Sequence, residues 1–160
     1  MNRSALVFFF AICATAAAGQ RLSTDAPIDI QADNWEANTD QKTMMYSGNV
    51  IVTQGDIRMH ANALTANSAD GKTADKIQAQ GNVVVDSPSV GTVTGDTGIW
   101  DVGARVVMFT GRVVLTKDKN VLRGNVMSIN LVNGQAKLGM GNTGGRVRGL
   151  FTPSLSGRNP

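Results

Sequence analysis

The sequence predicts an all-β protein built from many short antiparallel strands, and three observations lead to this prediction. Only 17 % of the residues are charged and 5 % are aromatic, while 18 of the 160 residues are glycine, a composition typical of strands joined by turns. Apolar and polar side chains alternate along several segments, as in half-buried strands. Two short phrases also recur at intervals of 29 to 34 residues, which indicates repeated supersecondary units.

Residues 1–18 are predicted to be a cleaved signal peptide. An apolar run that ends at Ala18 in a small-residue motif fits the signal-peptidase rule, and it is shorter than the roughly 18–20 residues that a membrane helix needs. Ile12 stands before Cys13, where a lipoprotein would need a small residue, so lipid attachment is not expected. The mature chain from Gly19 has no cysteine, and its fold must therefore be held by packing alone.

The mature chain repeats itself about every 30 residues. A Gly-Asn-Val or Gly-Arg-Val phrase begins at Gly48, Gly81, Gly111 and Gly145. A small residue followed by Asp or Asn interleaves with it at Ala32-Asp33, Ala61-Asn62, Gly95-Asp96 and Gly124-Asn125. Turn residues lie at 40–42, 70–72, 102–104 and 133–135. We therefore expect stacked units, each of which buries its apolar face on the next.

Within the units the alternation has a period of two, which places alternate side chains on one face of a strand. One such face carries Tyr46, Gly48, Val50 and Val52, and another carries Val107, Phe109, Gly111, Val113 and Leu115. A tight turn is predicted at 53–57, and a last ordered strand around 135–147. These features predict one β domain over 19–149, followed by a disordered tail rich in Pro, Ser and Gly over 150–160.

The segment 46–55, Tyr-Ser-Gly-Asn-Val-Ile-Val-Thr-Gln-Gly, with Ile57, Met59 and Ala61 after it, resembles the OstA domain of the OstA/LptA family of periplasmic lipopolysaccharide-transport proteins. Further similar segments are 26–33, 109–115 and 123–125, so that the resemblance covers about 26–138. It implies a twisted, half-open β-jelly roll whose hydrophobic groove holds the acyl chains of lipopolysaccharide. It also implies head-to-tail self-association through sheet edges, an LptC-like inner-membrane partner and an LptD-like outer-membrane partner.

Strand register predicts which apolar side chains face the interior, and together with the resemblance makes them candidates for lipid binding. They are Ile28, Ile30, Tyr46, Val50, Val52, Ile57, Met59, Phe109, Val113 and Leu115. Trp35 and Trp100 are either ordinary core residues or part of the groove lining. The sequence leaves open whether the interior is a closed core or an open groove.

No catalytic site, cofactor, metal site or nucleic-acid interface is expected. His60 is the only histidine and has no nucleophile near it in the sequence. Gly71-Lys72-Thr73 lacks the first glycine of a phosphate-binding loop, because Ala66 stands there. Two alternatives to a lipid carrier remain, namely a β-solenoid scaffold without lipid cargo and a secreted β-sandwich hydrolase, which the lack of clustered catalytic residues disfavours.

Charge is distributed unevenly between the two ends of the mature chain. Residues 19–40 contain one base and five acids, a net charge of −4, whereas residues 119–160 contain six bases and no acid. Such segments are often only solvated faces or tails. They could also set a head-to-tail order of assembly, or the basic end could attract lipid phosphates.

Overall fold

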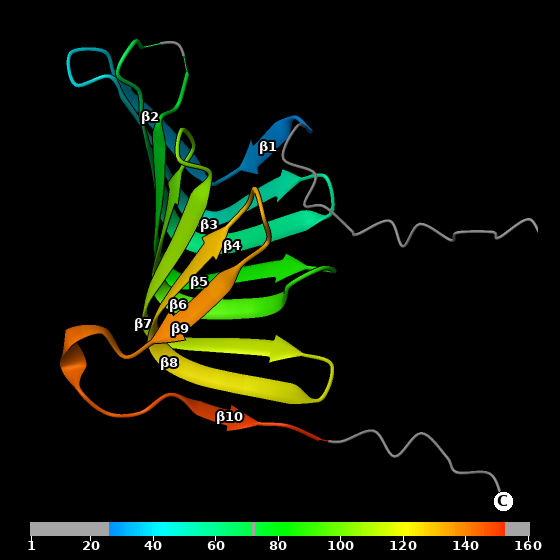
Figure 1. Cartoon of the computed structure of the whole chain (residues 1–160). Helices are drawn as coiled ribbons and strands as arrows, with labels where there is room; N and C mark the ends of the chain where they lie inside the picture. The colour runs from blue at the N-terminus through cyan, green and yellow to red at the C-terminus, as the bar shows by residue number, and fades with distance from the viewer. Residues whose placement is uncertain (1–25, 72, 153–160) are drawn as a thin grey trace, which may run out of the picture.

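The computed structural model describes residues 26–71 and 73–152, which form one ten-stranded antiparallel sheet without an α-helix. Its strands are β1 (Ile28–Gln31), β2 (Asn34–Asn38), β3 (Thr43–Gln54), β4 (Ile57–Asn67), β5 (Lys76–Ser87), β6 (Gly91–Asp101), β7 (Val106–Lys117), β8 (Asn120–Asn130), β9 (Ala136–Gly139) and β10 (Arg148–Leu150). Consecutive strands from β3 to β8 are neighbours in the sheet (Figure 1). The predicted all-β fold of stacked antiparallel strands is therefore confirmed.

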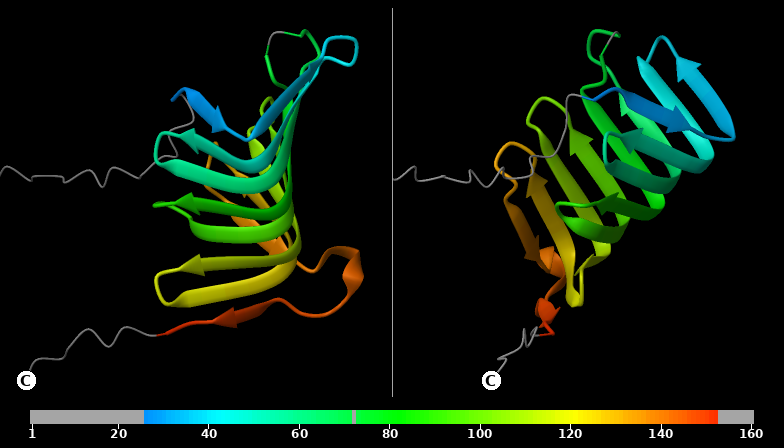
Figure 2. Two further views of the ribbon diagram at one scale, coloured as in Figure 1. Left: turned by 180° about the vertical axis from the view of Figure 1, so that it is seen from behind. Right: turned by 90° about the vertical axis from the view of Figure 1, so that its right-hand side faces the viewer.

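Each long strand bends near its middle, and the bends line up into one corner that divides the sheet into two arms (Figure 2). The first arm contains β2, β9 and the strand segments 43–47, 63–67, 76–80, 97–101, 106–110 and 126–130. The second arm contains β1, β10 and the segments 50–54, 57–61, 83–87, 91–95, 113–117 and 120–124. The arms diverge from the corner as a V, which is the half-open form that the resemblance implied.

The recurring phrases of the sequence build this corner. Register shifts interrupt the pairing of β3 with β4 between Ser47 and Val50, and the later pairs carry equivalent shifts. Gly48 and Asn49 both have positive φ angles, of 80° and 45°, and the same pair of conformations recurs at 81–82 and 111–112. These β-bulges turn each strand from one arm into the other.

The fourth phrase, at Gly145, does not form such a bulge. Here the chain leaves the sheet after β9, passes through a short 3₁₀ helix (Gly141–Thr143) and returns as β10. β9 and β10 pair with opposite halves of β8. The prediction of one last strand around 135–147 is therefore wrong, because the Gly-rich segment between β9 and β10 makes a wide excursion outside the corner (Figure 1).

Turns close the strand pairs at the far ends of both arms, and most lie where the sequence predicted them. A two-residue turn at Gly55-Asp56 joins β3 to β4. On the first arm, Asn38 and Asp101 start their turns by accepting hydrogen bonds from the backbone N–H groups of Gln41 (2.9 Å) and Ala104 (2.8 Å). Short polar side chains favour turns in this way because they satisfy backbone donors that no strand can.

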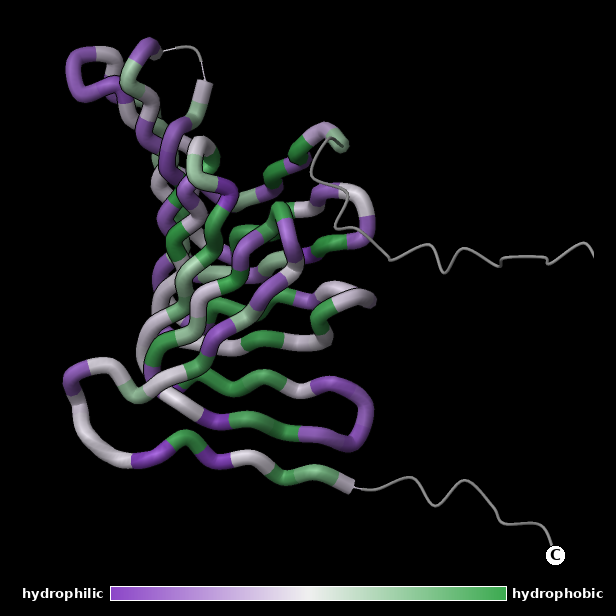
Figure 3. The backbone as a smooth tube through the Cα atoms, in the orientation of Figure 1, coloured by the Kyte–Doolittle hydropathy of each residue, from purple (hydrophilic) through white to green (hydrophobic). Residues whose placement is uncertain are grey.

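Apolar side chains of the two arms meet next to the corner and fill it. The fully buried side chains are those of Val50, Leu64, Val83, Val93, Phe109, Val113 and Met127. A Cβ atom added to Gly98 of the first arm would lie 3.4 Å from Cγ1 of Val83 in the second arm, so the arms are in close contact there. The alternating hydropathy along the strands (Figure 3) reflects this inward face.

Candidate functional site

Away from the corner the arms separate, and an apolar cleft opens between them. Its empty volume is about 760 Å³, including solvent space at its mouth. The second arm contributes Val52, Gln54, Ile57, Met59, Val85, Ser87, Gly91 and Val93, the adjoining turn Val90, and the first arm Trp100, Val107, Phe109, Ile129 and Leu131 at its end. None of these side chains is charged. The cleft is therefore suited to hydrocarbon rather than to a charged ligand.

The structure places the candidate residues on the interior face but in three different settings. Five of them line the cleft, namely Val52, Ile57, Met59, Trp100 and Phe109. Val50 and Val113 are fully buried at the corner, while Ile30, Tyr46 and Leu115 pack against the core from its margin. Ile28 and Trp35 lie on edge strands and are 41 % and 60 % exposed. Their contact with lipid stays a prediction.

The sequence did not single out several residues that line the cleft. Val85 and Val93 face it from β5 and β6, outside the segments that carry the family resemblance. Val107 belongs to the alternating face of β7 that the sequence did predict, so the same period of two could have identified it. Gln54 and Ser87 are polar, and an apolar pattern gives no reason to place them inside.

The two tryptophans are separated by the fold. Trp100 pairs in register with Ile77 and Val107 on the first arm, packs against the core and lines the cleft. Trp35 pairs with Tyr46 on the same interior face, but it belongs to the edge strand β2, which has no neighbour on its other side among the described residues. Trp35 is therefore exposed where the apolar interior meets the edge of the sheet.

The interior face ends in exposed apolar side chains at the opposite edge too. Gly149 of β10 pairs with Leu122 of β8, and an added Cβ at Gly149 would lie 2.7 Å from Cε2 of Phe151. Phe151 is 64 % exposed. The apolar lining thus runs from edge to edge, and both edge ladders are unpaired within the described residues.

The charges of the two edges differ in sign. β1 and β2 carry Asp29 and Glu36, and Asp33 lies between these strands. β9 and β10 carry Lys137 and Arg148. Arg148 lies directly opposite Arg123 of β8, and like charges in this position repel each other. The opposite signs that the sequence predicted at the two ends of the chain are thus present at the two edges of the sheet.

The residues that could serve other chemistry are scattered. In the described ranges, 26–71 and 73–152, no three His, Cys, Asp or Glu side chains gather as a metal site. His60 lies on the outer face of the second arm, between Ile51 and Val84 in register. The same ranges contain no helix with the length and hydropathy needed to cross a membrane.

Comparison with known proteins places the chain in a family. The chain belongs to the LptA/(LptD N-terminal domain) LPS transport protein family, whose model matches residues 29–135. It is 30 % identical over 147 residues to the uncharacterized protein R00383 of Rhizobium meliloti (strain 1021), covering 84 % of this chain and 76 % of that protein. The resemblance seen in the sequence is thereby confirmed, and the family is one of transport proteins.

A solved structure shares the fold. The chain is similar to LptH of Pseudomonas aeruginosa, described as the LptA homologous periplasmic component of the conserved lipopolysaccharide transport device. The TM-score is 0.71 at 20 % sequence identity, and the match covers 82 % of this chain and 99 % of LptH. At this identity the comparison bears on the fold alone.

Proposed function

We propose that this protein binds lipopolysaccharide in its cleft and forms part of a protein bridge that carries it through the periplasm from the inner to the outer membrane. The observation that carries the proposal is an uncharged cleft between two arms whose apolar lining reaches both open sheet edges. Exposing one CH₂ group to water costs about 0.8 kcal/mol, so a lipid with several acyl chains needs a continuous apolar path. The role is that of a carrier and requires no catalytic step.

The open edges suit assembly with proteins of the same fold. Unpaired backbone N–H and C=O groups on β1 and β2 can pair with a strand of a neighbour, and those of β9 and β10 can do the same on the other side. Exposed Ile28, Trp35 and Phe151 would then be covered. Head-to-tail copies, an LptC-like protein at the inner membrane and an LptD-like protein at the outer membrane are the proposed partners.

The signal peptide proposed for residues 1–18 lies outside the described residues and is tested separately. Intact mass of the protein recovered from the periplasm should correspond to a chain that begins at Gly19. Recovery of only the full-length chain from membranes would contradict export by cleavage. The tail proposed for residues 150–160 begins inside β10 and lies mostly outside the described part.

Lipopolysaccharide binding to the mature chain tests the carrier directly. Met59→Asp puts a charge into the cleft, where it is disfavoured unless paired, whereas His60→Asp puts the same charge on the outer face one residue later. We expect Met59→Asp to lose co-purified lipopolysaccharide, and His60→Asp to keep it. Circular dichroism confirms that both variants are folded.

The outcome also separates the carrier from its alternative. Equal binding by both variants would contradict the cleft as the binding site. A parent protein that assembled end to end but bound no lipopolysaccharide would instead favour a scaffold that carries no lipid.

A further inference from the structure

Two rows of residues cross the first arm from edge to edge, one on each face of the sheet. In such a row each residue lies directly opposite the next one on the neighbouring strand. The inner row begins at Trp35 of β2, passes Tyr46, Phe109 and Met127, and ends at Leu138 of β9. None of its members is charged, and its middle is buried, whereas Trp35 is 60 % exposed. The row therefore ends at an uncovered aromatic side chain.

The outer row consists of the adjacent residues on the same strands, and its two ends differ in charge. It begins at Glu36 of β2, passes Met45 and Met108, and ends at Lys137 of β9. Glu36 and Lys137 are its only charged members. Both are exposed, and neither forms an ion pair within residues 26–71 and 73–152. One end of the row thus offers a carboxylate and the other an ammonium group.

The direction of the edge strands decides how a second copy can continue the sheet. The first-arm row nearest the corner begins at Asn34 of β2 and ends at Gly139 of β9. β2 therefore leaves the corner and β9 approaches it, so that β2 of a second copy placed beside β9 extends the antiparallel order. The corners of the two copies align when Asn34 of one lies opposite Gly139 of the other.

We infer that a head-to-tail junction between two copies adopts this register, with Trp35 of one copy opposite Leu138 of the next and Glu36 opposite Lys137. This inference rests on the proposed self-association and assigns the residues that set its register. The inner row then continues from copy to copy and covers Trp35, while the outer row closes on opposite charges, which stabilise a cross-strand pair. A slip of one residue would turn Trp35 to the outer face, and a slip of two would leave Glu36 opposite an uncharged residue.

The second arm closes at the same junction. A row of opposite residues crosses it from Gln31 of β1 to Arg148 of β10. On β8 and on the edge formed by β1 and β2 alike, this row lies three residues from the first-arm row nearest the corner, so one placement of the second copy joins both rows. Ile28 then lies opposite Phe151. These apolar side chains are 41 % and 64 % exposed, and the junction would cover both.

Cysteine pairs test the register, because the chain from Gly19 onward has no cysteine of its own. Opposite residues of an antiparallel pair have Cα atoms about 4.5–5.5 Å apart, which a disulfide can span. Within one copy, Glu36 and Lys137 lie on opposite edges of the sheet (Figure 2), on the order of 30 Å apart at the usual strand spacing. A disulfide between these positions therefore joins two copies.

We expect Glu36→Cys/Lys137→Cys to form a ladder of disulfide-linked oligomers under mild oxidation. Glu36→Cys/Gly139→Cys is the matched control, because it places the second cysteine two residues away on the same face. The control should form at least about fivefold less of the linked product, since its Cα atoms would lie outside the range of a disulfide.

An exchange of charges tests the same contact without a crosslink. Glu36→Lys alone should weaken association about two- to fivefold, because it places like charges opposite each other. Adding Lys137→Glu should restore association, since the two charges are then opposite again. Glu36→Lys/Arg58→Glu has the same net charge, but it should stay weak because Arg58 lies on β4, away from both edges. Light scattering against concentration measures association, and circular dichroism confirms that each variant is folded.

The outcomes separate the register from the assembly itself. If the parent formed oligomers but the control pair crosslinked as well as Glu36→Cys/Lys137→Cys, or Lys137→Glu failed to restore association, the inferred contact would be wrong and head-to-tail assembly would stand. A parent protein that stayed monomeric would contradict both the register and the proposed self-association. Lipopolysaccharide binding, which Met59→Asp tests separately, would not be affected by either result.

Discussion

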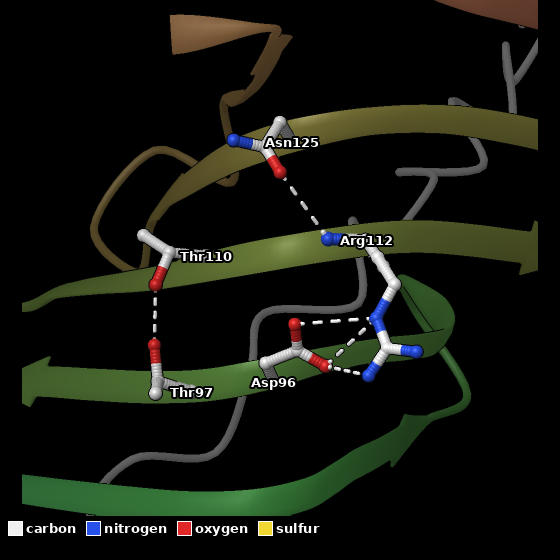
Figure 4. A network of polar contacts seen from close by, with 5 residues as sticks. All are labelled: Asp96, Thr97, Thr110, Arg112 and Asn125. Carbon is white, nitrogen blue, oxygen red and sulfur yellow. Dashed lines mark hydrogen bonds and ion pairs between the residues drawn. The ribbon is translucent and has the colours of Figure 1, made fainter. Parts of the chain in front are cut away.

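The guanidinium of Arg112 reaches back across the corner of the sheet to the carboxylate of Asp96. Nη2 lies 2.6 Å from Oδ1, and Nε lies 3.2 Å and 3.3 Å from the two carboxylate oxygens (Figure 4). Asn49 makes the equivalent contact two units earlier, where its Nδ2 donates to Asp33 at 2.9 Å. Both donors have positive φ angles, which are unfavourable for residues other than glycine. The side-chain hydrogen bonds help to hold the bulge in this conformation.

The Asp96–Arg112 pair predicts a small dependence of stability on acid pH. Hydrogen bonds from Arg112 lower the pKa of the Asp96 carboxyl below its ordinary value of 3.8. Its stabilisation is therefore complete above the pKa of the unfolded chain and is lost as the pH falls through the folded value. We expect Asp96→Asn to lower the melting temperature slightly near neutral pH, and the difference from the parent to shrink toward about pH 2. If the difference in melting temperature between Asp96→Asn and the parent grew in acid, the Asp96–Arg112 ion pair would not be the source of this stabilisation.

The corner glycines should be intolerant of a side chain. A Cβ atom at Gly81, which has a φ of +76°, would lie 2.5 Å from Nδ2 of Asn62. Gly81→Ala should therefore cost about 1–3 kcal/mol from backbone strain, together with a further loss from the clash. Gly134 is the matched control, because its φ is +70° but no atom of the described residues lies within 4 Å of an added Cβ. Urea denaturation should show a smaller loss of unfolding free energy for Gly134→Ala than for Gly81→Ala. Equal losses would contradict the close approach of Asn62 to Gly81.

Adjacent residues of β7 test the closed part of the interior. Phe109 is 1 % exposed and packs at the corner, whereas Met108 points to the outer face. We expect Phe109→Ala to lower the free energy of unfolding by about 3–5 kcal/mol. Met108→Ala should change it by less than about 0.5 kcal/mol, as is usual for surface positions. Denaturant unfolding measures both, and similar losses would mean that the corner is not the packed core.

The arginine pair at the β10 edge predicts opposite effects on stability and on assembly. Arg148→Glu would place an acid opposite Arg123, and we expect this cross-strand pair to stabilise the monomer by about 0.2–1 kcal/mol. The same change should weaken head-to-tail association, because the edge formed by β1 and β2 is acidic. Light scattering against concentration measures the second effect. Arg58→Glu on β4, away from both edges, should leave association unchanged. If the parent, Arg148→Glu and Arg58→Glu all associated equally, the edge charges would not direct head-to-tail assembly.

Much of the fold could be predicted from the sequence because its determinants are local. The alternation around Tyr46 and Val52 reports a strand with one buried face, whatever it packs against. The Gly-Asn and Gly-Arg phrases recur because each bulge needs its own left-handed residues, and the turn at Gly55-Asp56 is likewise encoded within a few positions. For the same reason the family resemblance was visible in these segments.

Only the tertiary structure decided which inward side chains are core and which line the cleft. Val50 and Met59 follow the same alternating pattern, yet Val50 is fully buried while Met59 lines open space. The difference depends on the distance between the arms, which grows away from the corner and is set by the bulges of all the strands together. The fourth phrase, at Gly145, likewise has a conformation that its local sequence does not determine. Among the described residues only the short strand β10 follows it, so its glycines form an excursion between β9 and β10 rather than another bulge.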